Sequence, residues 1–356
     1  MMNRRVGTGP TCRMILPAFT AGLFLVASPL YAQTTLPPVT VGGGLQTSFV
    51  HDIPADCEDC ATDRLLVNSV RLYVGGSATK NIKYMFNTEY DGGTQHVSVL
   101  DAAAQISSSP KFNIWMGRFL APSDRANLYG PYYSNHWSVY TDGIQDGYPF
   151  VTVGRSDGVM YWGQFGKVKV AGGAFDGPSL NTGSDELLTA ARVMVDFWDS
   201  EDGYYLNGTY YGAKNLLAVG GAVQAQDGNT AATLDFLLER KTKDGGAVSI
   251  ESEYANYDKL GGYYSGYDAS EGAYILGAYL IGKPAGPGKF QFLGKYAQAS
   301  FTKGITADFD QKTTELNVNY IIKDFNARVM FFFKNTTFSA VKTDSKQVGV
   351  GLQIQM

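Results

Sequence analysis

Alternation of apolar and polar residues is the most regular feature of this chain beyond its N-terminal stretch. From Val348 to Met356 the sequence reads VGVGLQIQM, so Val348, Leu352 and Ile354 share one face while glycines and glutamines share the other. A period of two is the signature of a β-strand whose two faces meet different surroundings. The pattern predicts an all-β protein.

The alternating segments and the turn residues between them predict sixteen strands. They are expected at 38–51, 63–76, 80–91, 95–107, 111–119, 149–164, 167–176, 187–212, 215–226, 230–240, 245–257, 272–282, 288–301, 311–322, 325–338 and 345–356. Two of these segments contain turn-like residues, SDG at 156–158 and DSEDG at 199–203. Reading both as turns gives eighteen strands, and we prefer sixteen because that count keeps every long connection on one side.

Two architectures produce such alternation, a soluble β-sandwich and a transmembrane barrel. Three features favour the barrel. The polar faces carry full charges near mid-strand, aromatic residues recur near strand ends, and short connections alternate with long ones. Closure also removes the exposed edges of so many strands. We therefore predict a transmembrane antiparallel β-barrel over residues 33–356, wide enough for an aqueous channel.

One connection, residues 119–150, lacks the period of two and is too aromatic for a disordered segment. We expect it to fold into the lumen as a constriction loop. The alternative is an extracellular lid packed on its own aromatic side chains. Its charged and hydrogen-bonding residues are Asp124, Arg125, Asn127, Tyr132, Tyr133, Asn135, His136, Asp142 and Asp146.

The N-terminus reads as an export signal. Three arginines, Arg4, Arg5 and Arg13, precede an apolar run at 14–27, and Ala32 offers a small residue for cleavage. An anchor helix is the alternative, but the run is short and contains Pro17. We expect residues 1–32 to be a cleaved signal peptide and the mature chain to reside in the outer membrane.

Composition changes the picture in two ways. With 29 Lys+Arg against 33 Asp+Glu the net charge is -4, which argues against a nucleic-acid partner. In the mature region Cys57 and Cys60 form a C-x-x-C pair, which we interpret as a small loop disulfide. A redox motif or a zinc site would need neighbours that the sequence does not show. No metal or cofactor is expected.

Three segments carry a family resemblance. IWMGRFLAPSDRANLYGPYYSNHW (114–137), FWDSEDGYYLNGTYYGAKNLLAVGGAVQAQ (197–226) and GGAVSIESEYANYD (245–258) are similar to porins of the phosphate-selective O and P superfamily. The resemblance implies a 16-stranded outer-membrane channel, commonly a homotrimer, with an inward third loop. It brings in anions such as phosphate as candidate solutes. The dense arginine and lysine arrangement on which phosphate selectivity depends in that family is not found here.

Basic residues are expected to gather around the constriction. The candidate constriction and lumen residues are Arg118, Asp124, Arg125, Tyr132, Tyr133, His136, Arg155, Lys167, Lys169 and Arg192. Acids dominate the later strands, so a basic wall opposite an acidic wall would set up a transverse field across the pore. The alternative is that these charges pair across strands.

Catalytic chemistry has little support. The three histidines, His51, His96 and His136, show no triad or metal-binding spacing. We therefore interpret the chain as a passive outer-membrane porin for small hydrophilic solutes or ions, in contact with lipid. The competing hypothesis is a plugged structural or adhesive barrel that binds an external partner through its loops.

Overall fold

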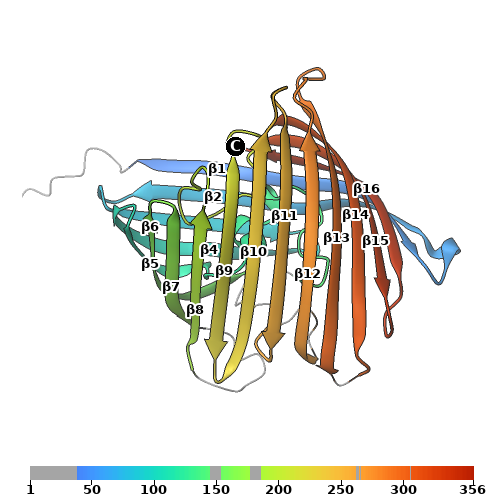
Figure 1. The fold of residues 1–356 in the computed structure, drawn as a ribbon, viewed down its shortest axis with the longest axis horizontal. Coiled ribbons are helices and arrows are strands. Elements are labelled where there is room, and N and C mark those ends of the chain that lie inside the picture. The colour runs from blue at the N-terminus through green and yellow to red at the C-terminus, as the bar shows by residue number, and fades with distance from the viewer. Residues whose placement is uncertain (1–37, 145–153, 177–185, 262–263, 265, 305) are drawn as a thin grey trace, which may run out of the picture. The chain divides into compact units, whose positions relative to one another are not determined.

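A computed structural model describes residues 38–144, 154–176, 186–261, 264, 266–304 and 306–356. These belong to one compact unit, Pro37–Met356, in which sixteen antiparallel strands close into a barrel (Figure 1). The predicted fold class and the count of sixteen are confirmed. Among the described residues, no helix is long and apolar enough to cross a bilayer. The expected signal peptide, residues 1–32, lies outside the described residues.

Each strand pairs with its neighbours in chain order. The strands are β1 Val39–Pro54, β2 Thr62–Ser77, β3 Ile82–Asp91, β4 His96–Ser109, β5 Phe112–Leu120, β6 Arg155–Phe165, β7 Val168–Asp176, β8 Leu188–Asp196, β9 Leu216–Gln226, β10 Asn229–Lys241, β11 Ala247–Asp258, β12 Tyr267–Leu280, β13 Lys289–Gly304, β14 Phe309–Lys323, β15 Ala327–Phe338 and β16 Ser345–Gln355. Pairing of Gly44 with Gln355 joins β1 to β16 and closes the barrel. We call the end where β1 begins and β16 ends the terminal rim, and the opposite end the loop rim.

Alternation along each strand separates a polar interior from an apolar exterior, as the sequence predicts. On β13, Gln291 and Lys295 are buried inside, whereas Phe292 and Tyr296 are exposed on the outside. A continuous apolar exterior is expected to contact lipid or another protein, because exposing so much apolar surface to water is unfavourable. The period of two therefore sets the side of every wall residue before any tertiary contact forms.

The described part of the constriction loop, residues 121–144, lies inside the barrel. We call it the inward loop. It carries a short helix α1 (Arg125–Tyr129) and a 3-10 helix η2 (Pro131–Tyr133). The Gln224 side chain of β9 donates to the Pro122 carbonyl, and the Tyr132 hydroxyl donates to the Ser69 carbonyl of β2, which lies nearly opposite β9 in the closed strand order. The loop thus spans the lumen, and the inward path is confirmed for these residues.

The predicted strand 187–212 is wrong. Strand β8 ends at Asp196, and residues 197–215, the second inward segment, pass into the lumen from the terminal rim. Glu201, Tyr204 and Leu206 are buried there, and the amide of Leu206 donates to the carbonyl of Leu128 in the inward loop. Within the polar run 199–203 only Glu201 is buried inside the barrel, whereas Asp199 and Asp202 are exposed at the terminal rim. The run interrupts the period of two because the chain leaves the wall there.

The expected separation of long and short connections fails at two places. The long second inward segment starts at the terminal rim, and the β9–β10 connection on the loop rim spans only residues 227–228. The predicted strand 149–164 also begins later, at Arg155, and its residues 149–153 lie outside the described part. Connection length alone therefore does not indicate the rim at which a turn lies.

The β1–β2 connection on the loop rim contains the C-x-x-C pair. Cys57 and Cys60 are bonded to each other, with their Cα atoms 5.2 Å apart, next to a 3-10 helix η1 (Glu58–Cys60). The bridge closes a loop of only a few residues, so it acts locally on this loop.

Candidate functional site in the lumen

The inward loop turns sharply into the lumen at the cap of helix α1. The Asp124 carboxylate accepts a hydrogen bond from the amide of Asn127 at 2.7 Å, which satisfies one of the free N–H groups at the start of the helix. Gly130 ends the helix with a φ of 62°, a left-handed value that favours glycine. These two residues fix the direction in which Arg125 points.

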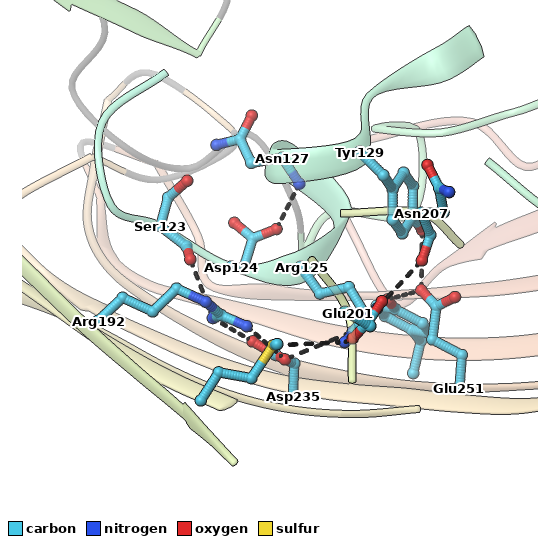
Figure 2. A network of polar contacts seen from close by, with 12 residues as sticks. Ser123, Asp124, Arg125, Asn127, Tyr129, Arg192, Glu201, Asn207, Asp235 and Glu251 are labelled. Carbon is cyan, nitrogen blue, oxygen red and sulfur yellow. Dashed lines mark hydrogen bonds and ion pairs between the residues drawn. The ribbon is translucent and has the colours of Figure 1, made fainter. Parts of the chain in front are cut away.

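Arg125 joins the two inward segments to the wall (Figure 2). Its guanidinium donates to both carboxylate oxygens of Glu201, at 3.0 and 2.5 Å, and to the carbonyl of Asn207 at 3.0 Å. Its Nε lies 3.7 Å from Asp235 of β10. Arg125 and Glu201 are both fully buried. An ion pair this deep holds its geometry because neither charge can turn to water.

Arg192 of β8 forms a second buried pair beside the first. It donates to both oxygens of Asp235, at 2.5 and 2.8 Å, and to the carbonyl of Ser123 in the inward loop at 3.0 Å. Figure 2 shows Asp235 between the two arginines. Arg192 of β8 and Asp235 of β10 thus pair across strands, which is the alternative to a transverse field.

Several ionisable groups near this network have buried polar atoms without a hydrogen-bond partner among the described residues. They are the Nζ of Lys169, one carboxylate oxygen of Asp124, one of Glu251 and both of Glu253. The other oxygen of Glu251 accepts from the hydroxyls of Tyr129 and Tyr274, at 2.8 and 2.6 Å. Water molecules fit such positions, because buried charges need partners.

The later part of the inward loop is bound to strands β13 and β15 by a second set of contacts. Lys295 of β13 forms an ion pair with Asp142 at 2.6 Å and lies 3.2 Å from Nε2 of His136. Because an ammonium group has no acceptor, His136 accepts through Nε2. Arg328 of β15 donates to the carbonyls of Pro131, Tyr132 and Ser134, and so holds the turn that follows α1.

Two of the predicted lumen residues lie elsewhere. Arg118 faces outward on β5, because the alternation places its neighbour Phe119 inside, and it pairs with Asp157 of β6 at 2.6 Å. Lys167 lies in the β6–β7 turn at the terminal rim and donates to the carbonyl of Trp198. Neither side chain faces the constriction, so fewer basic residues surround the loop than the sequence predicts.

Two of the remaining candidates, Tyr133 and Arg155, line a cavity between the inward loop and the wall β1–β4. Arg71 pairs with Glu89 at 2.8 Å and stacks over the ring of Tyr132. Arg155 lies 3.4 Å from Asp101. The cavity has a volume of about 640 Å³, and its lining includes Arg71, Asn87, Asp101, Tyr133, Arg155 and, at the terminal rim, Met356.

Residues that the sequence alone did not single out complete the site. Glu201 was hidden inside a segment interpreted as a strand, and Asp142, although noted in the loop, was not linked to Lys295. Asp235 and Glu251 belong to the acids of the later strands, and their partners come from segments far away in the chain. No metal site is formed by three or more His, Cys, Asp or Glu side chains within the described ranges.

Two residues of the inward loop, Asp124 and His136, change the folding stability in opposite directions as the pH falls. Burial raises the pKa of Asp124 to about 7. Burial, with Lys295 and Arg328 nearby, holds the pKa of His136 well below its ordinary 6.5. Below pH 6.5 the unfolded chain takes up a proton on His136 that the folded chain refuses, so stability falls. Between about pH 7 and 3.8 the folded chain keeps a proton on Asp124 that the unfolded chain lacks, so stability rises.

We expect single variants to separate these two effects. Relative to the unmodified protein, His136→Gln, which keeps a neutral acceptor for Lys295, gains stability as the pH falls below 6.5, because the His136 effect is removed. Asp124→Asn, which keeps the helix cap, loses stability relative to the unmodified protein over the same range. Each difference in slope approaches about 1.4 kcal/mol per pH unit. Denaturant unfolding at a series of pH values measures both, and identical slopes in the two variants would contradict the assignment.

Comparison with solved structures identifies the fold. The chain matches no protein-family model and no curated protein sequence. OprB of Pseudomonas putida superposes with a TM-score of 0.64 at 10% identity, covering 89% of this chain and 94% of OprB. OmpF of Salmonella typhi gives 0.61 at 11% identity, with 90% and 98% covered. The trimer form of in-vitro folded OmpT, an outer membrane protein of Vibrio cholerae, gives 0.55 at 15% identity, with 89% and 99% covered. At these identities the likeness is one of fold.

Proposed function

We propose that this chain is a porin of the bacterial outer membrane, a passive diffusion channel for small hydrophilic solutes and ions. The observation that carries the proposal is the cavity of about 640 Å³ between the inward loop and the wall β1–β4, whose lining includes Arg71, Asp101 and Arg155, within a closed barrel whose exterior is apolar. Barrels of sixteen strands are wide enough to leave an aqueous path beside a loop. The porin fold of the compared structures supports the same function.

The walls of this cavity carry paired charges. Arg71 faces Glu89 and Arg155 faces Asp101, so the described ion pairs sum to zero. A selective filter needs a ring of one sign at the narrowest point. We therefore propose weak charge selectivity and no dedicated phosphate site, because Arg118 and Lys167 lie away from the constriction.

Planar-bilayer recording tests the channel. We expect discrete conductance steps from the purified protein and a reversal potential near zero in a salt gradient. A protein that inserts without steps would support the second candidate, a plugged structural or adhesive barrel. That candidate is favoured by one observation, the complete burial of Arg125 and Glu201 inside the barrel.

Arg71 and Arg155 provide a mutational test of the path. Replacing both with glutamine leaves Glu89 and Asp101 as net negative charge on the cavity wall. We expect the reversal potential to move toward cation selectivity, because wall charge biases the ions that share the pore. Arg118→Gln is the matched control, since that arginine faces outward, and it should leave selectivity unchanged. Equal behaviour of the two variants would rule out this path.

Assembly and export complete the proposal. We propose that three copies form a homotrimer, as the compared OmpT does in its trimer form, and that residues 1–32 direct export and are removed. Crosslinking in native membranes reports on the first, and N-terminal sequencing of the mature protein reports on the second.

A further inference from the structure

A group of basic side chains lies at the terminal rim, away from the lumen. Arg240 and Lys241 end strand β10, Lys243 lies in the turn that follows, and Trp198 belongs to the second inward segment. Together with Asn215 and Thr242 they line a surface pocket of about 570 Å³. We call these six residues the basic rim pocket.

The pocket lies where the apolar band of the barrel ends. On the outward face of β10, Leu234, Phe236 and Leu238 are followed by Arg240. Phe197, whose amide donates to the carbonyl of Leu217 on the intervening strand β9, is 58% exposed. In a membrane barrel, the change from aliphatic to charged residues along an outward face marks the boundary between hydrocarbon and headgroups, and Trp is enriched at that depth.

The cations of the basic rim pocket are without ion-pair partners in the described part of the chain. The Arg240 guanidinium instead lies 5.6 Å from the centre of the Trp198 ring. Glu239, next to Arg240 in sequence, faces the barrel interior and accepts from the hydroxyls of Thr209 and Ser249. Two further carboxylates near the pocket are engaged in local hydrogen bonds. Asp199 accepts from the amide of Asn215 at 2.7 Å, and Asp244 accepts from the hydroxyl of Thr242. Three positive charges therefore stand beside one concave surface.

We propose that the basic rim pocket binds the phosphate of an anionic phospholipid headgroup. The inference rests on the proposed function for the placement of the terminal rim at the periplasmic leaflet. Guanidinium and ammonium groups favour phosphate oxygens, and clustered Lys and Arg at a membrane surface recognise anionic lipids. Lipid is favoured over a soluble polyanion because Leu238 and Phe197 continue from the pocket as an apolar surface for the acyl chains.

Lipid titration of the purified full-length protein in neutral detergent tests this site. The probes are phosphatidylglycerol and phosphatidylcholine with identical acyl chains, followed by native mass spectrometry. We expect the unmodified protein to retain phosphatidylglycerol in preference. The variant Arg240→Gln should weaken that binding about fivefold, and the triple variant R240Q/K241Q/K243Q about a hundredfold. Equal retention of the two lipids, or no loss in either variant, overturns the proposal.

A triple variant at the loop rim, K259Q/K303Q/K312Q, is the matched control because it removes the same charge. It should bind phosphatidylglycerol as the unmodified protein does, and an equal loss there would show a net-charge effect and overturn the site. Two soluble competitors test whether the pocket binds a lipid headgroup or a soluble anion. Displacement of the lipid by inorganic phosphate or by an acidic cell-wall peptide, each at the concentration of the lipid, would assign the pocket to that soluble anion instead.

The single variant keeps the test valid if the triple variant does not fold, and near-ultraviolet circular dichroism reports on folding. Channel conductance is a separate readout. A protein that binds phosphatidylglycerol at the pocket but passes no current would retract the proposed function alone, whereas steps with no lipid preference would retract the lipid site alone.

Discussion

Replacing Arg125 with methionine is expected to destabilise the barrel interior by about 3–5 kcal/mol, since it leaves Glu201 and Asp235 buried with one positive partner fewer. Glu201 loses both of its charge-assisted hydrogen bonds from Arg125. The inward loop and the second inward segment also lose the link that joins them. In bilayers we therefore expect higher and noisier conductance, and in denaturant an earlier unfolding transition.

A double variant distinguishes loss of the pair from loss of packing. In Arg125→Met combined with Glu201→Gln, the uncompensated carboxylate is gone, so most of the lost stability should return. The control is Arg118→Met, which breaks the outward pair with Asp157. That pair is partly exposed, with 28% and 49% of the side chains accessible, and such pairs contribute about 0–1 kcal/mol. Equal losses in the Arg125 and Arg118 variants would contradict the central role of Arg125.

Much of the wall of this barrel can be predicted from the sequence. The period of two assigns each strand residue to the inside or the outside, because a strand offers no other arrangement of its side chains. The alternation places Arg192 and Asp235 in the lumen and Val348 and Leu352 on the exterior. It also leads to the count of sixteen strands. The absence of a period of two over 119–150 likewise marks the segment that leaves the wall.

The contents of the lumen are harder to predict. Glu201 reaches Arg125 across 76 positions of sequence, and no local pattern specifies a contact of that kind. The prediction joins the second inward segment to a strand because that keeps every long connection on one side, although Tyr204 and Leu206 leave the wall. They pack inside the barrel instead. Arg118 was placed in the lumen for its proximity to the loop, although the alternation with Phe119 assigns it to the exterior.

Removal of the second inward segment is expected to widen the channel and raise its conductance severalfold. The β8 and β9 strands keep pairing beyond their ends, since the amide of Asp199 donates to the carbonyl of Asn215 at 2.9 Å. A two-residue Asn-Gly turn fits between these positions and replaces 200–214. The change removes Tyr204 and Leu206 from the lumen without altering the wall. The background should be Arg125→Met, so that the loss of Glu201 does not leave an unpaired arginine.

The comparison is therefore between Arg125→Met with and without residues 200–214, so the difference reports only on the segment. An aqueous path through a barrel conducts according to the cross-section that side chains leave open, and this segment occupies the lumen from the terminal rim. A second control replaces Cys57 and Cys60 with serine, which alters a loop-rim connection outside the lumen and should leave conductance unchanged. If shortening the segment leaves the step size unchanged, ions do not pass where it lies, and the path is limited elsewhere by the inward loop.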